Sequence, residues 1–380
     1  MNIADRNNMP DFPKEKFAFV QQGAAIKDER FETKPIGFFK DAMLRFRKNK
    51  ASVTAIVIIL IIAFISIFGP SFNPYGFNDQ DITRINLPPR IPVLENFGIA
   101  DGTRILTNRR VDKLDDEEKY PEGTIIEVFN RRVEKRVEMC DVKINAYVQS
   151  GCPDDYFWLG TDYLGRDLWT RMCRGSRVSL IIAVLSVLAN IVIGIIYGAI
   201  AGYYGGKVDM VMMRICEIIG AFPQVVVATL FIMFFGTGIF SIVMALIIRG
   251  WISTARMIRS QFLRFKNREY VLAARTLGVK DTALIFRHIL PNSIGPIITK
   301  AMIEVPGAIF AESFLAFIGL GLQAPEPSIG VLLSEGQKVL LHYPYQTLFP
   351  ALLISILMIS FNLFSNGLRD AFDPTMRGID

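Results

Sequence analysis

The sequence has little of the material from which most enzyme active sites are built. Its 380 residues include two histidines and four cysteines, too few for a His-rich metal site or an all-cysteine zinc site. His288 and His342 have no metal-ligand partner at a suitable spacing, and motifs for a serine or cysteine nucleophile are absent. We therefore expect neither catalytic residues nor a bound metal in this chain.

A nucleotide-binding loop is lacking as well. A Walker A motif reads Gly-x-x-x-x-Gly-Lys-Ser/Thr, because its backbone N–H groups and its lysine surround the phosphates. The nearest match ends in Gly206-Lys207, but Ala201 stands at the first glycine position and Val208 at the hydroxyl position. We expect the chain to bind no cofactor, so that any ATP and magnesium would be bound by a partner.

Charge is also scarce, since 21% of the residues are charged and 51% are hydrophobic. This balance excludes an ordinary soluble enzyme. The hydrophobic residues gather in runs close to the 17–25 residues that cross a membrane core of about 30 Å. Six runs are predicted to span a membrane as helices: residues 51–68, 178–201, 212–235, 239–255, 294–320 and 348–363. In the second run, Gly194 and Gly198 form a small-xxx-small face suited to close helix contact.

The basic residues predict how these spans are oriented, because short cytoplasmic flanks are enriched in Lys and Arg. Five basic residues lie just before the first span: Lys40, Arg45, Arg47, Lys48 and Lys50. The loop 256–292 holds eight Lys and Arg against two acidic residues, whereas 236–238 has no charge and 323–347 has one lysine. Six spans with both termini in the cytoplasm satisfy these asymmetries. The net charge of +6 is then a feature of topology, and no nucleic-acid partner is expected.

We expect no secretory signal peptide in the N-terminal region before the first span. The run at 51–68 lies too far along the chain, is too long and lacks a cleavage site. Residues 1–35 are polar and irregular, and we expect them to be cytoplasmic and disordered. Residues 36–69 are expected to hold the first span preceded by a helix at 36–46, where aromatic and aliphatic residues lie among basic ones. That helix is either interfacial, lying on the membrane surface, or an N-terminal extension of the span.

The long segment between the first two spans, residues 70–157, contains no spanning run and is predicted to be an extracytoplasmic inserted domain. Alternating apolar and polar residues at 124–129 and 142–148 predict strands, and hence a small β-rich fold. Cys140 and Cys152 both fall in this segment, on the oxidising side of the membrane. They are a candidate disulfide on grounds of compartment and parity.

The basic loop 256–292 contains two predicted short helices. Good helix formers lead to Gly278, which can end a helix or turn it sharply. A second helix is expected to begin at Asp281, as a cap, and to end by Pro291. Two short helices with interleaved apolar and basic residues are suited to docking into a groove of another protein.

This loop resembles the cytoplasmic motif of ABC-importer permeases, Glu-Ala-Ala, three residues, Gly, nine residues, Ile, one residue, Leu-Pro. Leu272 replaces the Glu and His288 the Ile, and five positions match in register: Ala273, Ala274, Gly278, Leu290 and Pro291. Four further stretches are similar to the C-type permease subunits of oligopeptide, dipeptide and nickel importers: 160–180, 202–209, 317–330 and 368–374. The resemblance covers 36–69 and 158–377, and 75–155 departs from it.

The resemblance implies an all-α membrane protein of the ABC-importer permease type, with six transmembrane helices and a β-rich insertion, in the bacterial cytoplasmic membrane. It implies a permease core at 158–380 and four partners: a homologous second permease, two cytoplasmic ATPases and an extracytoplasmic substrate-binding protein. The loop at 256–292 would couple the ATPases to the spans. Its candidate coupling residues are Ala273, Ala274, Gly278, Asp281, Arg287, His288, Leu290 and Pro291.

Two carboxylates in the predicted fifth span, Glu304 and Glu312, are candidates for the translocation path, because ionisable residues within spans often mark a pathway. A carboxylate lining the conduit would suit the cationic amino terminus of a peptide. Pairing with Arg249 or with the partner permease is an equally open alternative. Arg214 and Glu217 are expected to form a local pair.

Cargo stays open between peptides, nickel and other small solutes. The rival class is a secondary transporter driven by an ion gradient through its own carboxylates. Transport by this chain alone without ATP would favour that class.

Overall fold

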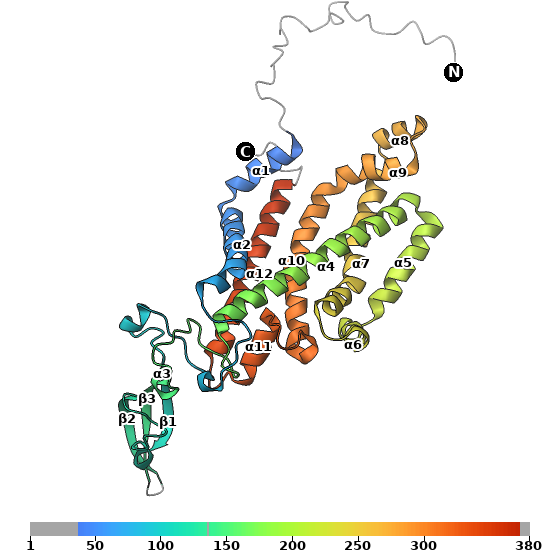
Figure 1. Ribbon diagram of the computed structural model, residues 1–380. Helices are drawn as coiled ribbons and strands as arrows, with labels where there is room; N and C mark the ends of the chain where they lie inside the picture. The colour runs from blue at the N-terminus through green and yellow to red at the C-terminus, as the bar shows by residue number, and fades with distance from the viewer. Residues whose placement is uncertain (1–36, 135–136, 373–380) are drawn as a thin grey trace, which may run out of the picture. The chain divides into compact units, whose positions relative to one another are not determined.

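The computed structural model describes residues 37–134 and 137–372 (Figure 1). By internal contacts the chain divides into residues 1–41 and residues 42–380. The segment 1–35, predicted to be disordered, lies outside the described residues.

The first apolar run forms a helix of its own. Helix α1 (Phe38–Lys48) ends just before α2 (Lys50–Phe68), and the backbone of Asn49 between them is extended. The side-chain oxygen of Asn49 accepts a hydrogen bond from the Ser52 backbone N–H at 3.2 Å, a cap that starts a new helix. Of the two alternatives for 36–46, a continuous extension of the first span is therefore wrong.

Five helices are long and apolar enough to cross a membrane, within the part of the chain that the structure describes. They are α2, α4 (Leu168–Tyr204), α7 (Ile239–Phe265), a run Asp281–Leu320 that contains α10 (Ile294–Leu315), and α12 (Tyr345–Phe372). A sixth span exists only if the bent pair α5 (Gly206–Ala221) and α6 (Gln224–Phe235) is taken as one.

The predicted third span, 212–235, is therefore wrong as one straight helix. Helices α5 and α6 meet at an angle of 79°. Proline has no backbone N–H and pushes the residue before it out of the helical region, and Phe222, just before Pro223, is extended at φ −72°, ψ 130°. The Phe-Pro pair inside the apolar run is the signal that could have predicted this break.

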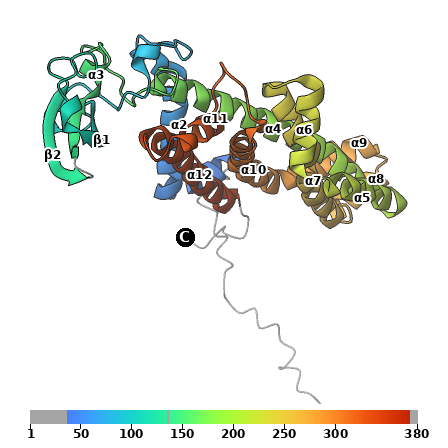
Figure 2. The same cartoon turned by 90° about the horizontal axis from the view of Figure 1, so that it is seen from below.

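The bundle is closest-packed between α4 and α7. Three glycines one turn apart on α4 face α7, and a Cβ atom built on any of them would overlap α7 atoms: Gly194, Gly198 and Gly202. The predicted small-xxx-small face is thus confirmed, because only glycine lets the two backbones approach this closely. In Figure 2, α2 and α12 lie side by side away from α5, α6 and α7.

The inserted segment folds into a three-stranded antiparallel sheet in the order β1-β3-β2. Its strands are β1 (Thr103–Arg110), β2 (Ile125–Glu134) and β3 (Val137–Asn145). The strand predicted at 124–129 is confirmed within β2. The strand predicted at 142–148 is wrong beyond Asn145, because α3 (Ala146–Gln149) begins there with Asn145 as its cap, accepting from the N–H groups of Tyr147 and Val148. Strand β1 was not predicted.

Further short elements are four 3₁₀ turns, a π-helical segment and one helix: η3 (Gly69–Phe72), η4 (Ile82–Arg84), η5 (Leu94–Phe97), η6 (Val111–Lys113), η9 (Ala316–Leu320) and α11 (Ile329–Lys338). Helix α11 packs on α12 and on the end of the α10 run. In Figure 1, α11 and the start of α4 lie at one end of the bundle, and the end of α12 lies at the other.

Cys140 and Cys152 are both free thiols, so the candidate disulfide is not formed. Cys140 is fully buried within the sheet's own apolar cluster, and its Sγ donates to the Arg109 carbonyl at 3.5 Å. Cys152 packs instead against a second cluster that includes Phe157, and burial raises its pKa. The two side chains belong to separate cores. The disulfide predicted from the presence of two cysteines on the oxidising side of the membrane is therefore wrong.

Candidate functional sites: the surface loop and the membrane pocket

The loop between α7 and α10 begins with a short helix that ends at a glycine turn. Helix α8 (Glu269–Thr276) is followed by Gly278 at φ +80°, a left-handed conformation that favours glycine. The Gly278 and Val279 N–H groups donate to the Arg275 and Ala274 carbonyls at 3.0 and 3.2 Å. The turn predicted at Gly278 is confirmed.

The second half of the loop agrees with the prediction only at its start. A helix, α9 (Asp281–Ala283), does begin at Asp281, but Asp281 is not its cap: Lys280 holds the N-cap position, and its side chain makes no capping hydrogen bond. The chain then continues through η7 (Leu284–Ile289), a π-helical segment, and η8 (Leu290–Ser293) straight into α10. Pro291 therefore does not end the helix. It lies in the first turn of η8, where the N–H that proline lacks is not needed.

One face of this loop is fixed to the bundle. Its buried residues share one apolar cluster with α4, α7 and α10: Val271, Ala274, Leu284, Ile285 and Ile289. The Tyr203 hydroxyl, from the end of α4, donates to Asp281 Oδ1 at 2.5 Å and accepts from Arg275 Nη2 at 3.4 Å. The loop is therefore packed and hydrogen-bonded against the ends of these spans.

The opposite face of the loop is open. Leu277 is 84% exposed and Phe286 is 51% exposed. Of the predicted coupling residues, five are exposed: Ala273, Gly278, Asp281, Arg287 and Pro291. His288 and Leu290 are half-buried, and Ala274 is buried. The two alanines of the motif therefore differ, since Ala274 packs inward and Ala273 faces out.

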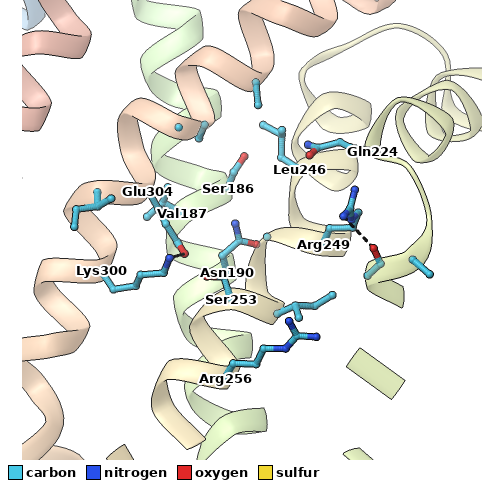
Figure 3. A pocket seen from close by; sticks show the side chains of 18 of the residues that line it. Ser186, Val187, Asn190, Gln224, Leu246, Arg249, Ser253, Arg256, Lys300 and Glu304 are labelled. Atoms are coloured by element: carbon cyan, nitrogen blue, oxygen red, sulfur yellow. Dashed lines mark hydrogen bonds and ion pairs between the residues drawn. The ribbon is translucent and has the colours of Figure 1, made fainter. Parts of the chain in front are cut away.

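A pocket of about 850 Å³ lies among α4, α5, α6, α7 and α10 (Figure 3). Its polar lining comes from all five helices: Ser186, Asn190, Glu217, Gln224, Arg249, Ser253, Arg256, Lys300 and Glu304. The break between α5 and α6 contributes Gly220, Ala221 and Gln224 to this wall. The bend that the sequence analysis missed is thus part of the pocket.

Glu304 lines the pocket with one of its two carboxylate oxygens engaged, while Oε2 has no hydrogen-bond partner among the described residues. Its Oε1 accepts from Thr254 Oγ1 at 2.9 Å and lies 3.3 Å from Lys300 Nζ. The predicted alternative, a pair with Arg249, is not formed. Arg249 Nη2 instead donates to the Gly220 carbonyl at 3.0 Å. The local pair Arg214–Glu217 is confirmed at 2.6 Å.

Glu312 does not line the pocket. It is fully buried, and its Oε2 accepts from Ser179 Oγ on α4 at 2.9 Å. Eight helical residues at roughly 100° each leave two side chains about 80° apart, which separates Glu312 from the pocket-facing side that carries Glu304. The structure therefore brings one of the two predicted carboxylates to the pocket and not the other.

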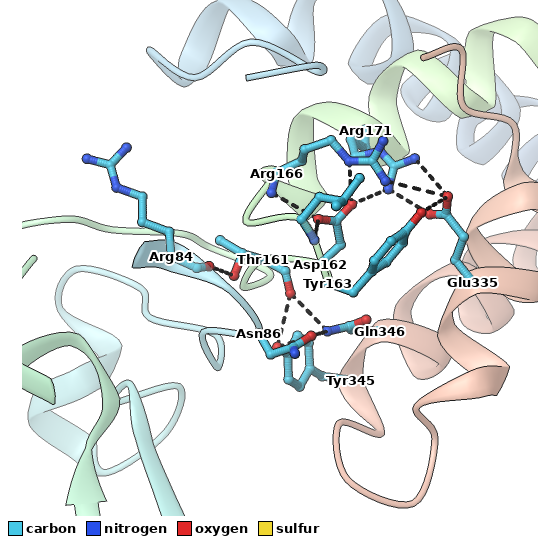
Figure 4. Close-up of polar contacts among 11 residues, drawn as sticks. Arg84, Asn86, Thr161, Asp162, Tyr163, Arg166, Arg171, Glu335, Tyr345 and Gln346 are labelled. Carbon is cyan, nitrogen blue, oxygen red and sulfur yellow. Dashed lines mark hydrogen bonds and ion pairs between the residues drawn. The ribbon is translucent and has the colours of Figure 1, made fainter. Parts of the chain in front are cut away.

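A buried ion cluster at the start of α4 was missed as a site (Figure 4). The α4 ion cluster consists of Asp162, Arg166, Arg171 and Glu335. Asp162 pairs with Arg166 Nε at 2.7 Å and with Arg171, and Arg171 Nη1 reaches Glu335 of α11 at 2.7 Å. Both arginine side chains are at most 1% exposed. Dense charge at 160–171 was a signal, but Glu335 lies far away in the sequence.

A neutral set of hydrogen bonds lies beside the α4 ion cluster. Gln346 Nε2 donates to Asn86 Oδ1 at 2.8 Å and to the Thr161 carbonyl at 3.0 Å, and Tyr345 OH donates to the same carbonyl at 3.1 Å. These bonds tie the start of α12 to the inserted segment and to the chain leading into α4.

Apolar helices around a polar pocket define a multi-spanning membrane protein. Comparison of the chain with known protein families shows to which family it belongs. The family model described as "Binding-protein-dependent transport system inner membrane component" matches residues 191–378. The model "N-terminal TM domain of oligopeptide transport permease C" matches residues 37–89. The chain belongs to this family of inner-membrane permease components, which confirms the resemblance drawn from its motifs.

Curated relatives match along almost the whole chain. The oligopeptide transport system permease protein OppC of Bacillus subtilis is 35% identical over 97% of this chain and 100% of its own length. The dipeptide transport system permease protein DppC of the same organism is 35% identical over 90% and 87%. OppC of Escherichia coli K12 is 32% identical over 92% and 95%.

A solved chain of the MetNI methionine ABC transporter, in an inward-facing form, gives a TM-score of 0.45 at 17% identity, over 53% of this chain and 96% of that chain.

Proposed function

We propose that this chain is the transmembrane permease subunit of an ATP-driven importer of peptides. The observation that carries the proposal is the match to oligopeptide and dipeptide permeases over nearly the full chain, together with a rigid surface loop at the end of the bundle. The chain itself would catalyse no reaction. It would form one half of the translocation path.

The surface loop is the proposed coupling site. Two cytoplasmic ATPases would hydrolyse ATP, and the exposed side of α8 and α9 would lie in a groove of one of them. Because the other side of the loop is packed into the cluster of α4, α7 and α10, a displacement of the loop would be passed to these helices as a rigid-body motion. An exposed apolar residue such as Leu277 is suited to such a groove.

The pocket is the proposed part of the path that this chain contributes. A homologous second permease would supply the other half, and an extracytoplasmic binding protein would deliver the cargo. In this arrangement both termini lie in the cytoplasm of a bacterium, and the inserted segment lies outside. The Lys and Arg distribution supports this orientation.

The test is transport by the whole assembly in proteoliposomes. We expect uptake of a labelled tripeptide that requires ATP, the ATPases and the binding protein. Uptake by this chain alone, without ATP, would overturn the proposal in favour of a secondary transporter.

The coupling site has its own test, in which ATPase subunits are captured with Gly278→Pro. Proline fixes φ near −65° and is incompatible with φ +80°, so we expect capture to be lost. Gly123→Pro is the matched control, because Gly123 has φ +82° in a turn of the inserted segment. Equal capture by both variants would refute the coupling role of the loop.

A further inference from the structure

The charges that line the pocket are not balanced. Arg249, Arg256 and Lys300 face Glu217 and Glu304 there. Lys300 is paired with Glu304, and Glu217 is paired with Arg214, which lies outside the lining. Among the described residues, no ion pair reaches Arg249 or Arg256, so the two arginines of α7 are the uncompensated charges of the pocket.

The two arginines lie on one side of α7. Arg249, Ser253 and Arg256 all line the pocket at spacings of four and three residues, which places them on one helix face about 10 Å long. Figure 3 shows Arg249 and Arg256 entering from α7, and Lys300 and Glu304 from α10. The pocket therefore has one wall that is cationic and another whose charges are already paired.

The charge of Arg249 costs free energy at this depth in the membrane, so a functional role is expected for it. It lies near the middle of α7 (Ile239–Phe265), and ionisable residues at such depth face a cavity and mark a pathway. Its Nη2 hydrogen bond to the Gly220 carbonyl satisfies a group left without its helical partner by the break after α5. That bond fixes the guanidinium at the pocket wall and leaves most of its five N–H donors available.

We propose that the Arg249–Arg256 face of α7 is a binding site for the terminal carboxylate of the transported peptide. This inference rests on the proposed function. Peptides of any sequence share only their backbone and their two charged ends, so a permease that passes many sequences has few constant groups to bind. Arginine binds carboxylates with paired, charge-assisted hydrogen bonds. Glu304, neutralised by Lys300, is a poor site for the amino terminus.

The test uses the complete assembly in proteoliposomes, with trialanine and trialanine amide as probes. The measured quantity is the ratio of ATP-dependent uptake of the acid to that of the amide. Because every permease variant is assayed with the same binding protein, a change in the ratio reports on the permease. We expect Arg249→Gln and Arg256→Gln each to lower the ratio about threefold or more, as loss of a solvent-accessible charge contact does.

The controls separate binding from structure. Lys207→Gln removes an exposed cation from α5 outside the pocket lining and is expected to leave the ratio unchanged. Arg249→Lys keeps a positive charge and is expected to lower the ratio less than Arg249→Gln. Arg256 has no recorded hydrogen bond among the described residues, so its variant tests the site even if Arg249→Gln fails to fold. Equal loss of acid and amide uptake, at an unchanged ratio, would overturn the inference. Absence of ATP-dependent uptake in the wild type would overturn the proposed function instead.

Discussion

Helix α4 is held in two different ways along its length. Its C-terminal half is held against α7 by glycines that allow backbone contact. Its N-terminal end is held by the α4 ion cluster, which links it to α11. In lipid, helices gain no hydrophobic energy by associating, so close packing must hold them. A buried ion cluster is stable only where every charge is compensated.

The two contacts also differ in how they fail. A glycine contact fails by steric overlap when a side chain is added, since a Cβ atom built on Gly198 would overlap the Ala255 carbonyl oxygen and Ile258 Cβ. The α4 ion cluster fails by losing one charge, which leaves the others buried without compensation. The predictions below separate these two modes.

The largest effect is expected for Asp162→Asn. The asparagine keeps the Oδ1 that accepts from the Leu164 and Arg166 N–H groups at 2.9 Å, but an NH2 group replaces the Oδ2 that accepts from Arg166 Nε and Arg171 Nη1. The charge and these two hydrogen bonds are therefore lost together. Two buried arginines then share Glu335 alone, and removing one partner of a buried pair costs about 3–5 kcal/mol. Thermal unfolding of the purified protein in detergent measures the loss.

Glu326→Gln is the control for that change, because Arg174 and Glu326 form a pair whose side chains are 35% and 36% exposed. We expect it to cost less than about 1 kcal/mol. A similar loss of stability in both variants would show that burial does not make the ion pairs of the α4 ion cluster more important for stability than an exposed pair.

A smaller, pH-dependent effect is expected for Asp167, the cap of α4. Burial raises its pKa from 3.8 to about 6, and the Asp162 carboxylate adds to the rise, although hydrogen bonds from Thr170 oppose it. Since the folded-state pKa lies above the unfolded one, this group contributes stability below about pH 4 that is lost as pH rises through 6. The amount is on the order of 2–3 kcal/mol.

Asp167→Asn should abolish this pH dependence. The melting temperature of the wild type relative to that of the variant is expected to fall between pH 4 and pH 7.5. The exposed Asp154 provides the control Asp154→Asn, for which the difference should stay flat. A flat difference for Asp167→Asn as well would contradict the assignment.

The glycine contact is tested by Gly198→Ala, for which we expect a loss of about 1–3 kcal/mol from overpacking. The nearest α7 atom belongs to the backbone and cannot rotate away. In the control Gly307→Ala, the new Cβ has no neighbour within 4 Å, and the gain in helix propensity should slightly stabilise the protein. Equal stability of the two variants in the same unfolding assay would show that α4 and α7 are not held by this contact.

Much of the fold could be predicted because its signals are local. The apolar run at 51–68, the glycine face of α4 and the turn at Gly278 all follow from residues close together in the chain. The break at Pro223 is equally local, because a proline interrupts a helix even where the average hydrophobicity of the run is that of a span.

The candidate sites could be predicted only in part. The loop was recognisable from a motif of about twenty residues. The α4 ion cluster was not, because Arg171 and Glu335 are separated by 164 positions. Glu304 and Glu312 look equivalent in the sequence, and packing alone places one in the pocket and the other against Ser179.

The sequence by itself determined that this chain is a membrane permease, because hydrophobic runs, basic flanks and loop motifs are written in consecutive residues. The tertiary structure decided which polar groups meet. It left Cys140 and Cys152 as free thiols in separate cores and paired Glu304 with Lys300. It also turned Arg249 and Arg256 of α7 toward a common cavity. The physical reason is that pairing and burial depend on distances across helices, which a linear pattern does not contain.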